Sequence, residues 1–397
     1  MDMTQPDLYQ RARDLLPQLS AWRRDLHARP ELGFEEVRTA AQVAASLKEM
    51  GIAVETGVGV TGVVGRLGSG HPAIGLRGDM DALPLQEAND VPYCSQNPNV
   101  MHACGHDGNT AIVLGAAKLL STMPNRPAGE IRFLLQPSEE NQDDEGKSGA
   151  QRMIEDGALE GLDAIVGQHV DSLTPVGRIQ LASGYAMASA DSFEATIIGS
   201  GAHGAMPHTG VDPIYILSHV IQAIHAIVSR RIDPIRPAVI SIGSVHSGLA
   251  GNIIPERVQL NGTIRSFDPE VRKQLWAELE RALAVARALG GDYRLDIQGG
   301  YPSTFNHGSV SDLIAASARD LVGPDCVEVM EPTMGAEDFS LMSQKAPAAM
   351  FMTGVEIEGD TRQHHNETFD MDERGLAVGA AVMAETTCRL LVTLADA

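Results

Sequence analysis

Histidine, cysteine and carboxylate side chains occur in this chain where short apolar runs end or where helices are expected to begin. The apolar runs end in Asp79 and Asp81, in Glu139 and Glu140, and in His169. Two further clusters, residues 102–107 (HACGHD) and 364–367 (HHNE), precede predicted helices. Thiolate, imidazole and carboxylate groups bind transition metals, and a carboxylate outside the ligand set can act as a general base. Ligands of open α/β sheets bind at the carboxyl ends of strands, so we expect these side chains to converge there.

Each of these features has an ordinary structural explanation when it is taken alone. A single buried histidine is usually a hydrogen-bonded core residue, a pair such as Glu139 and Glu140 is usually a solvated loop, and a free cysteine is usually a small hydrophobe. Their convergence at one sheet edge favours a metal site, because two adjacent carboxylates repel each other unless a cation lies between them.

The surrounding segments predict an α/β fold. Helical periodicity covers residues 7–27 and 35–50, and short strands are predicted at 52–56, 62–67 and 73–77. The pattern then alternates, with a helix to residue 121, a strand at 130–135, a helix at 149–155 and a strand at 163–168. This order predicts a mostly parallel sheet flanked by helices. Residues 57–62 match G-x-G-x-x-G, but no helix follows them, so we interpret them as a hairpin rather than a dinucleotide site.

The order of elements changes in the middle of the chain. Strands are predicted at 192–198, 238–245, 257–265 and 293–297, and helices at 212–230 and 268–289. Both helices begin with Asp-Pro, an N-cap followed by proline. The resulting β-α-β-β-α-β order is typical of an α+β ferredoxin-like unit. After residue 301 the α/β pattern resumes, with helices at 310–321 and 372–395 and strands at 326–331 and 349–353.

We therefore expect a small domain inserted into a larger one. Residues 1–188 and 300–397 would form the catalytic, metal-binding domain, and residues 189–299 an inserted lid and dimerisation domain. An open four-stranded sheet leaves edge strands available for pairing, which favours a homodimer or a larger oligomer built through the insert.

Composition restricts the partners and the compartment. The 397 residues contain 30 Lys and Arg against 52 Asp and Glu, a net charge of −22 that would repel nucleic acid and anionic membrane surfaces. Four cysteines are too few for a disulfide framework in a chain of this length. The first residues show no apolar signal core, and no apolar stretch is long enough for a membrane span. We expect a cytoplasmic protein that binds neither nucleic acid nor membranes.

Nine motifs occur in order along the chain. They are LRGDMDALP (76–84), MHACGHDGNTA (101–111), LLQPSEE (134–140), GQHV (167–170), GSGAHGAMPHTGVDP (199–213), GNIIPE (251–256), GTIRSFD (262–268), TMGAEDFS (333–340) and HNETFDMDE (365–373). Over essentially its whole length the chain resembles the M20 metallopeptidase family, specifically its amidohydrolase branch of IAA-amino acid, hippurate and N-acyl-L-amino acid hydrolases. The resemblance implies a catalytic domain of the zinc-exopeptidase type.

The resemblance implies a site for two divalent metal ions. Cys104 would bridge them, with Glu140 and His365 completing one site and His106 and His169 the other. Thiolate and imidazole with few carboxylates suit Zn²⁺, Mn²⁺, Co²⁺ or Ni²⁺ better than Mg²⁺ or Ca²⁺.

Neighbouring polar residues are not expected to be ligands. His365 is preferred to His364 because the last histidine of the family lies four residues before an aromatic residue, here Phe369. His102 is interpreted as a neighbouring histidine. Asp79 stands where other M20 branches have a metal-binding histidine, and is not expected to bind metal in this chain.

The resemblance also implies roles in catalysis. Glu139 would be the general base that removes a proton from a metal-bound water and later protonates the departing amine, and Asp81 would orient the metal site. From the inserted domain, His203 would donate a hydrogen bond to the oxyanion, typically in the active site of the partner subunit. Asn252 and Arg265 would bind the substrate carboxylate. Taken alone, His203 is an ordinary loop histidine and Arg265 an ordinary surface arginine.

Two departures from the family pattern affect the surroundings of this site. Asn109 replaces a histidine that is not a ligand in the family, and the acidic segment 141–147 replaces a glycine-rich one. We interpret this segment as a solvated loop, with an effect on pocket entry or on the cation environment as the alternative.

The leading hypothesis is a metal-dependent amidohydrolase that cleaves N-acyl amino acids, or small aryl or dipeptide amides, into a carboxylic acid and a free amino acid. A metallo-carboxypeptidase or dipeptidase with the same machinery is the alternative within the family. A non-catalytic metal- or metabolite-binding protein is the alternative outside enzymes. Serine hydrolases are disfavoured because the chain has no G-x-S-x-G motif, and zincins because it has no H-E-x-x-H motif.

Overall fold

The computed structural model of the protein describes residues 7–396. Residues 1–6, part of the segment in which we expect no signal core, lie outside the described residues. The chain forms two compact units. Unit 1 comprises Met1–Gly184, Phe305–Glu331 and Leu341–Ala397, and unit 2 comprises Tyr185–Thr304 and Pro332–Ser340. The predicted boundaries at 188/189 and 299/300, and the roles assigned to the two domains, stay predictions.

Unit 1 is built on a mixed, mostly parallel sheet of eight strands in the order β1-β2-β4-β3-β5-β16-β6-β15. The strands are β1 (Ala53–Val58), β2 (Gly62–Gly68), β3 (Ala73–Asp79), β4 (Glu130–Gln136), β5 (Ala164–Pro175), β6 (Ile179–Leu181), β15 (Val327–Val329) and β16 (Ala348–Glu356). The central strands β4, β3, β5 and β16 are parallel, and the β1-β2 hairpin adds to the sheet antiparallel to β4. All residues of β3 are buried, as expected of a central parallel strand covered on both faces. The predicted α/β class is confirmed.

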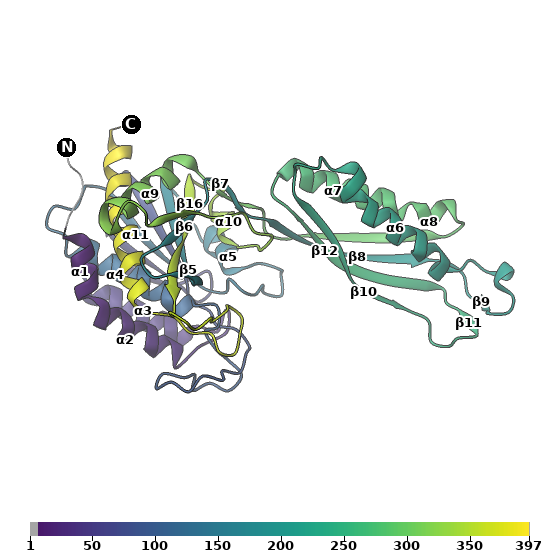
Figure 1. The fold of residues 1–397 in the computed structure, drawn as a ribbon, viewed down its shortest axis with the longest axis horizontal. Coiled ribbons are helices and arrows are strands. Elements are labelled where there is room, and N and C mark those ends of the chain that lie inside the picture. Colours follow the sequence, from purple (N-terminus) through teal and green to yellow (C-terminus); the bar gives the residue numbers. More distant parts are fainter. Residues whose placement is uncertain (1–6, 397) are drawn as a thin grey trace. The chain divides into compact units, whose positions relative to one another are not determined.

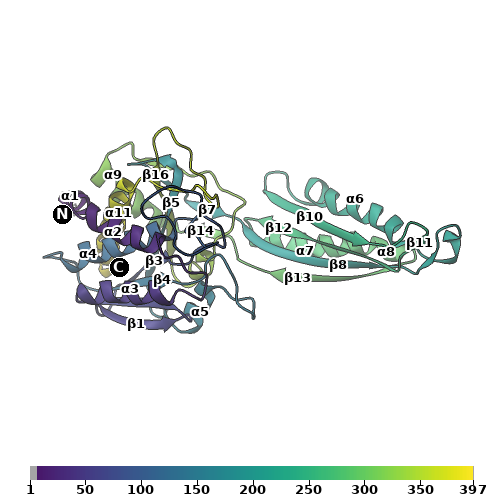
Figure 2. The ribbon, with the colours of Figure 1, turned by 90° about the horizontal axis from the view of Figure 1, so that it is seen from below.

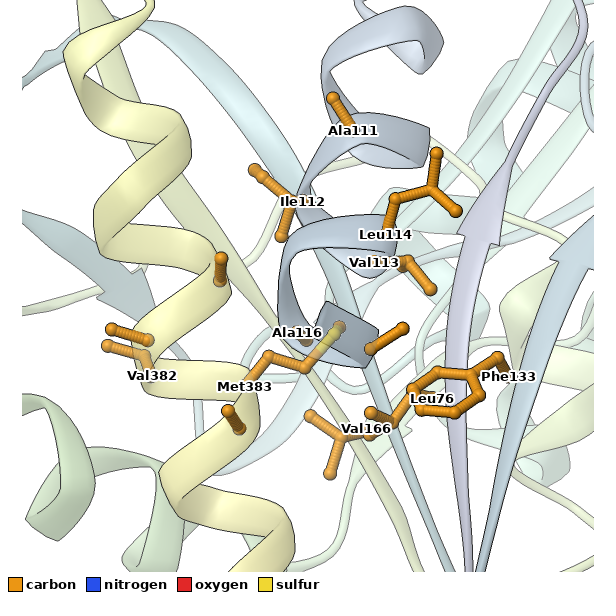
Figure 3. Close-up of a cluster of buried hydrophobic side chains, with 14 of the residues drawn as sticks. Leu76, Ala111, Ile112, Val113, Leu114, Ala116, Phe133, Val166, Val382 and Met383 are labelled. Carbon is orange, nitrogen blue, oxygen red and sulfur yellow. The ribbon is translucent and has the colours of Figure 1, made fainter. Parts of the chain in front are cut away.

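Helices pack against this sheet (Figures 1 and 2). They are α3 (Val37–Glu49), α4 (His106–Ser121), α5 (Gly149–Glu155), α9 (Gly308–Val322) and α11 (Arg374–Ala395), and the helices α1 (Leu8–Asp14) and α2 (Leu16–His27) pack on α4 and α11. Helix α4 contacts β3, β4 and β5, α11 contacts β16, and α3 contacts β1 and β2. Figure 3 shows the core in which Ala116 of α4 and Met383 of α11 lie near the sheet residues Leu76 and Val166.

Helix α11 is long and apolar enough to cross a membrane by length and composition alone. Within the fold, however, 94% of its most apolar window is buried. A helix that is apolar on all sides and enclosed by protein is a core helix, and α11 fits this description.

Unit 2 contains a four-stranded antiparallel sheet in the order β10-β12-β8-β13. Its main elements are β8 (Ser189–Ile198), α6 (Pro213–Arg231), β10 (Ala238–Ser247), β12 (Arg257–Ser266), α7 (Pro269–Leu283), α8 (Val285–Ala288) and β13 (Asp292–Gly299). The ferredoxin-like order is therefore confirmed. Both long helices are N-capped by the predicted aspartates, since Asp212 accepts the N–H of Ile214 and Asp268 that of Glu270.

The described residues contain several short elements that were not predicted. They are β6 (Ile179–Leu181), β7 (Gly184–Met187), β9 (Ala202–His203), a 3-10 turn at Pro207–Thr209, β11 (Ile253–Ile254), β14 (Thr304–Asn306) and α10 (Phe339–Met342). Two predicted helices are divided, 7–27 at Leu15 into α1 and α2, and 268–289 at Ala284 into α7 and α8. The predicted hairpin at residues 57–62 is confirmed, because Val58 pairs with Gly62 between β1 and β2.

Candidate metal centre

The predicted ligands of unit 1 lie together, near the carboxyl ends of its parallel strands and at the first residue of α4. The ladder between β3 and β5 ends at the pair Arg77 and Gly167, and His169 follows two residues later. Strand β5 itself continues to Pro175, so His169 lies within a strand rather than at the end of one as predicted. The turn before α4 needs Gly105, which has φ +91° and whose added Cβ would lie 2.4 Å from Val170 Cγ2.

Among the groups of side chains that could hold a metal ion, two consist of the expected ligands alone. The first ligand group is Cys104, His106 and His169, and the second ligand group is Cys104, Glu140 and His365. Within each group the ligand atoms lie within 4.8 Å of one another. The structure therefore brings together all five side chains expected to be ligands, and Cys104 belongs to both groups.

Hydrogen bonds at Nδ1 orient the histidines of the first ligand group. His106 Nδ1 lies 2.9 Å from the Asp81 carbonyl oxygen and 3.1 Å from Asp81 Oδ1, so it donates and leaves Nε2 with the lone pair. His169 Nδ1 donates to the Val170 carbonyl at 2.7 Å, and its Nε2 lies 3.6 Å from Cys104 Sγ. Both imidazoles thus present Nε2 to the same region, which is the arrangement that metal binding requires.

The second ligand group forms where the loop before α11 meets the turn after β4. His365 Nε2 lies 3.3 Å from Cys104 Sγ and 3.2 Å from Glu140 Oε1. The backbone N–H of His365 donates to the Ala103 carbonyl at 2.8 Å, which attaches this loop to the segment that carries Cys104. His365 has φ +57°, a conformation uncommon for residues other than glycine.

The charges of the cluster favour the thiolate. Burial raises the pKa of the Cys104 thiol, but His106 and His169 outweigh this effect and leave it well below its ordinary value. In turn, hydrogen bonds to Cys104 and Glu140 raise the pKa of His365 to about 10. The thiolate is the form that binds metals, so the charges around Cys104 favour it as a potential ligand.

His106 Nε2, a buried polar atom of the cluster, lacks a hydrogen-bond partner among the described residues. Glu140 Oε1, which pairs with His365, lies 3.9 Å from it. Leaving a buried polar atom without a partner costs about 1–3 kcal/mol. A cation between His106 Nε2 and Glu140 Oε1 would remove this cost, so the residues present fit a divalent metal ion of the kind that imidazole, thiolate and carboxylate bind.

Asp79 does not take part in either ligand group. Arg77 Nη1 donates to Asp79 Oδ2 at 2.8 Å, and Asn109 Nδ2 donates to Oδ1 at 2.8 Å. Asn109 Oδ1 in turn accepts the Val170 N–H at 2.9 Å. The asparagine that departs from the family pattern therefore connects the ends of β3 and β5 beneath the ligands.

Glu139 lies beside the ligands in the turn that follows β4. One of its carboxylate oxygens is within 4.8 Å of ligand atoms of both His106 and Glu140. Asp81 Oδ2 accepts the N–H of Glu140 at 3.0 Å while its other oxygen faces His106. Asp81 therefore contacts the turn with Glu139 and one histidine at the same time.

The three predicted residues of unit 2 fall at two different places. His203 in β9 pairs with Ile253 in β11, and the Gly204 N–H donates to the Asn252 carbonyl, so His203 and Asn252 lie at the same tip. Arg265 lies on β12 opposite Ala190, near the other end of that strand. From Arg257 at its start to Arg265, β12 extends about 26 Å at about 3.3 Å per residue. Unit 2 thus does not bring Asn252 and Arg265 to one carboxylate.

Sequence reasoning missed a buried network of charges beneath the ligands. Arg23 is fully buried in α2, where its Nε donates to Asp107 Oδ2 and its Nη2 to Asp370 Oδ1. His27 Nδ1 also contacts Asp107 Oδ2 at 2.8 Å. Asp107 follows the candidate ligand His106 directly, so this network connects α2 to the start of α4. A buried face of α2 with two basic residues four positions apart was the signal available in the sequence.

Comparisons with known proteins agree with this site. The model of peptidase family M20/M25/M40 matches residues 75–389. Thermostable carboxypeptidase 2 of Saccharolobus solfataricus is 39% identical, over 95% of this chain and 98% of that protein. N-acetyl-L-cysteine deacetylase of Bacillus subtilis is 37% identical, over 94% of this chain and 88% of that protein.

A solved structure resembles the whole chain. The Bacillus subtilis YXEP protein, described as a dinuclear metal binding peptidase from the M20 family, has a TM-score of 0.84 and 32% identity, over 96% of this chain and 99% of that chain. The family match covers most of the length, and the relatives align over nearly all of it. The chain therefore belongs to peptidase family M20/M25/M40.

Proposed function

We propose that this protein is a metal-dependent amidohydrolase that cleaves N-acyl amino acids into a carboxylic acid and a free amino acid. The observation that carries the proposal is the shared thiolate: two ligand groups meet at Cys104, with Glu139 within 4.8 Å of His106 and Glu140. A carboxylate at this position beside two cation sites is suited to hydrolysis of an amide. The deacetylase relative supports the acyl amino acid as substrate class.

Two divalent cations would be held by the two ligand groups, with Zn²⁺, Mn²⁺, Co²⁺ or Ni²⁺ favoured by the thiolate and imidazole donors. When bound, such ions lower the pKa of water and stabilise negative charge on a carbonyl oxygen. Asp81 would keep His106 in the tautomer that leaves Nε2 available, through its contact with Nδ1.

Glu139 would move the proton. Its carboxylate accepts a proton from the attacking water as the oxygen bonds to the amide carbon, and it gives that proton to the nitrogen as the carbon–nitrogen bond breaks. His203 would donate a hydrogen bond to the oxyanion formed between these two steps, and Arg265 and Asn252 would bind the substrate carboxylate.

A homodimer would resolve the separation of these groups within unit 2. His203 and Asn252 lie at one end of β12 and Arg265 near the other, about 26 Å away at about 3.3 Å per residue. We propose that the tip with His203 and Asn252 completes the active site of a partner subunit, while Arg265 serves its own. Strand β10 forms an edge of the sheet in unit 2, so its outer N–H and C=O groups are available for pairing with a second copy.

A carboxypeptidase or dipeptidase activity is the alternative, because the carboxypeptidase relative is as similar as the deacetylase. The experiment uses chelator-stripped protein reloaded with each of the four metals and assayed on N-acetyl amino acids, N-benzoyl amino acids and dipeptides. Metal-restored release of amino acids from the acylated substrates supports the amidohydrolase. Cleavage of peptides alone supports the alternative, and no turnover with any metal supports a non-catalytic metal- or metabolite-binding protein.

The Glu139→Gln variant tests the assigned base. It should retain two metal ions per chain and lose turnover by about 100-fold or more, the usual contribution of general base catalysis. Glu145→Gln in the exposed loop is the matched control, because it removes a carboxylate that pairs with Lys147 and Arg152. Full activity of Glu139→Gln would show that another group is the base.

Mixing two inactive variants tests the shared active site. If His203 acts in the partner subunit, a heterodimer of His203→Ala and Glu139→Gln chains has one intact site. Random exchange between the two homodimers should then restore about one quarter of the wild-type activity. If His203 acts in its own chain, both sites of every heterodimer are defective, and no activity returns.

We propose a cytoplasmic location. All four cysteines lie in the described part of the chain and none forms a disulfide, which is the usual state in a reducing compartment. The net charge of −22 further supports the expectation that neither nucleic acid nor a membrane surface is a partner.

A further inference from the structure

The turn that carries Glu139 has an unusual backbone. Ser138, directly before Glu139, has φ +41° although it is not a glycine, and it is fully buried. Its carbonyl accepts the Gly149 N–H at 2.9 Å, and its Oγ donates to the Asn141 carbonyl at 3.0 Å. A residue in this conformation costs about 1–3 kcal/mol and persists only where its surroundings hold it.

Two carboxylates hold the N–H groups on either side of Glu139. Asp81 Oδ2 accepts the Glu140 N–H at 3.0 Å, and Glu36 Oε1 accepts the Ser138 N–H at 2.8 Å. Because these N–H groups belong to the residues before and after Glu139, the two bonds fix the backbone from which its side chain extends. Asp81 already has an expected role at the metal site, whereas Glu36 has none.

Capping of the helix that follows does not explain the buried position of the Glu36 side chain. Glu36 is the residue before α3, yet its side chain makes no capping hydrogen bond to that helix. Glu31 does this instead, since its two oxygens accept the N–H groups of Arg38 and Thr39. The second oxygen of Glu36 accepts the Thr61 hydroxyl at 2.5 Å.

Glu36 is also costly to keep in this position. Its side chain is completely buried and, among residues 7–396, its carboxylate accepts from the Ser138 N–H and the Thr61 hydroxyl and forms no ion pair. Burial raises the pKa of Glu36 to about 7, the largest of the effects that act on it. A carboxyl group kept at such a site, with a backbone N–H and a hydroxyl as partners, needs a reason beyond packing.

We propose that Glu36 is a positioning residue for amide hydrolysis, which through the Ser138 N–H sets the backbone of residues 137–140 and thereby the direction of the Glu139 carboxylate. The proposal rests on the function proposed for Glu139. Glu36 touches no ligand atom in either ligand group, so its effect reaches the reaction through Ser138 and Glu139. A displacement of about 1 Å in a catalytic group lowers the rate about 100-fold, so a loss of this bond should appear in kcat.

The test compares Glu36→Met, Glu36→Gln and Glu36→Asp in the full-length, metal-loaded protein. Methionine keeps the volume and removes the acceptor, so kcat should fall about 10- to 100-fold with KM within about threefold and two metals per chain. Glutamine keeps an oxygen that accepts the Ser138 N–H, so kcat should stay within about threefold of wild type. Aspartate is one methylene group shorter, so its carboxylate lies farther from the Ser138 N–H and kcat should fall. This variant keeps the test informative if the methionine variant does not fold.

Glu31→Gln is the matched control. It weakens the cap of α3 but does not contact the turn, so it should lower the melting temperature without changing kcat. The double variant Glu36→Met/Glu139→Gln should be no slower than Glu139→Gln alone, because Glu36 acts through Glu139.

Three kinetic results would overturn the proposal. They are an unchanged kcat in Glu36→Met and Glu36→Asp, a Glu36→Gln variant as slow as Glu36→Met, or a loss in the double variant that equals the product of the single losses. A loss of activity that only follows a loss of metal would overturn it as well. Full activity of Glu139→Gln is a separate outcome, because it refutes the assigned base, whatever the Glu36 variants do.

Discussion

His364 and His365 are neighbours in the chain but face different partners. His365 Nε2 lies 3.3 Å from Cys104 Sγ and 3.2 Å from Glu140 Oε1. Both ring nitrogens of His364 form hydrogen bonds with the backbone. Nδ1 donates to the Cys104 carbonyl at 2.9 Å, and Nε2 accepts the Ser172 N–H at 3.3 Å. The positive φ of +57° at His365 turns the chain between the two rings.

This difference gives a matched pair of variants. His365→Ala should lose at least one metal ion per chain and about 100-fold or more in activity, because it removes a ligand from the second ligand group. His364→Ala should retain both ions and lose about 1–2 kcal/mol of stability through its two hydrogen bonds. Metal analysis by mass spectrometry together with turnover distinguishes the two. Retention of both ions in His365→Ala would refute its assignment as a ligand.

The thiols of Cys104 and Cys94 should react at different rates in the metal-free protein. Burial raises the pKa of Cys104, but His106 and His169 lower it to well below the ordinary value, whereas burial and Glu87 raise the pKa of Cys94. Because the thiolate is the nucleophile, iodoacetamide at neutral pH should modify Cys104 first. Reloading with Zn²⁺ should protect it. Peptide mass spectrometry measures both sites in one sample, and equal labelling of the two would contradict the prediction.

Arg23 should be essential for stability, in contrast to its neighbour Arg24. Arg23→Met leaves Asp107 and Asp370 without their buried cation, and breaking a buried pair in this way costs about 3–5 kcal/mol. The Arg24 side chain is 52% exposed and pairs with Glu373, so Arg24→Ala should cost less than about 1 kcal/mol. Urea unfolding of the metal-free proteins measures both. Similar midpoints for the two variants would show that the buried network contributes little.

Glu87 should make stability depend on pH in the acid range. Burial raises its pKa, but hydrogen bonds from His27 and the Ser95 N–H outweigh this and bring the pKa of Glu87 to about 2, against 4.5 ordinarily. A lowered pKa in the folded state stabilises the protein above the ordinary value, and this contribution is lost as pH falls toward the folded value. Glu87→Gln should therefore cost about 1–3 kcal/mol at pH 7, and the difference from wild type should shrink by pH 3.

Urea unfolding at pH 7, 4 and 3 tests this prediction on metal-free protein, so that loss of metal in acid does not contribute. Glu55→Gln on the outer strand β1 is the control, because Glu55 is exposed and should cause no pH-dependent difference. A constant difference in the free energy of unfolding between wild type and Glu87→Gln from pH 7 to pH 3 would contradict the lowered pKa of Glu87.

The order of elements and the kinds of ligand could be read from the sequence, because both are encoded locally. Burial on one face of a helix or strand leaves a period in the chain, and an Asp-Pro pair marks a helix start wherever it occurs. The β-α-β-β-α-β order of unit 2 and the helix at residues 149–155 followed directly from such patterns. The candidate ligand types were likewise visible, as glutamate and histidine after apolar runs and as cysteine and histidine before predicted helices.

Which side chains meet was decided by the tertiary structure, because contacts between distant segments depend on packing that no local pattern records. Glu36 and Ser138 are 102 residues apart, and Arg23 and Asp107 are 84 apart, yet each pair shares a buried hydrogen bond. Asn252 and Arg265 show the converse, because they are close in the sequence and the extended strand β12 keeps them apart. Sequence thus determined the chemistry available to this protein, and the fold determined which groups can act together.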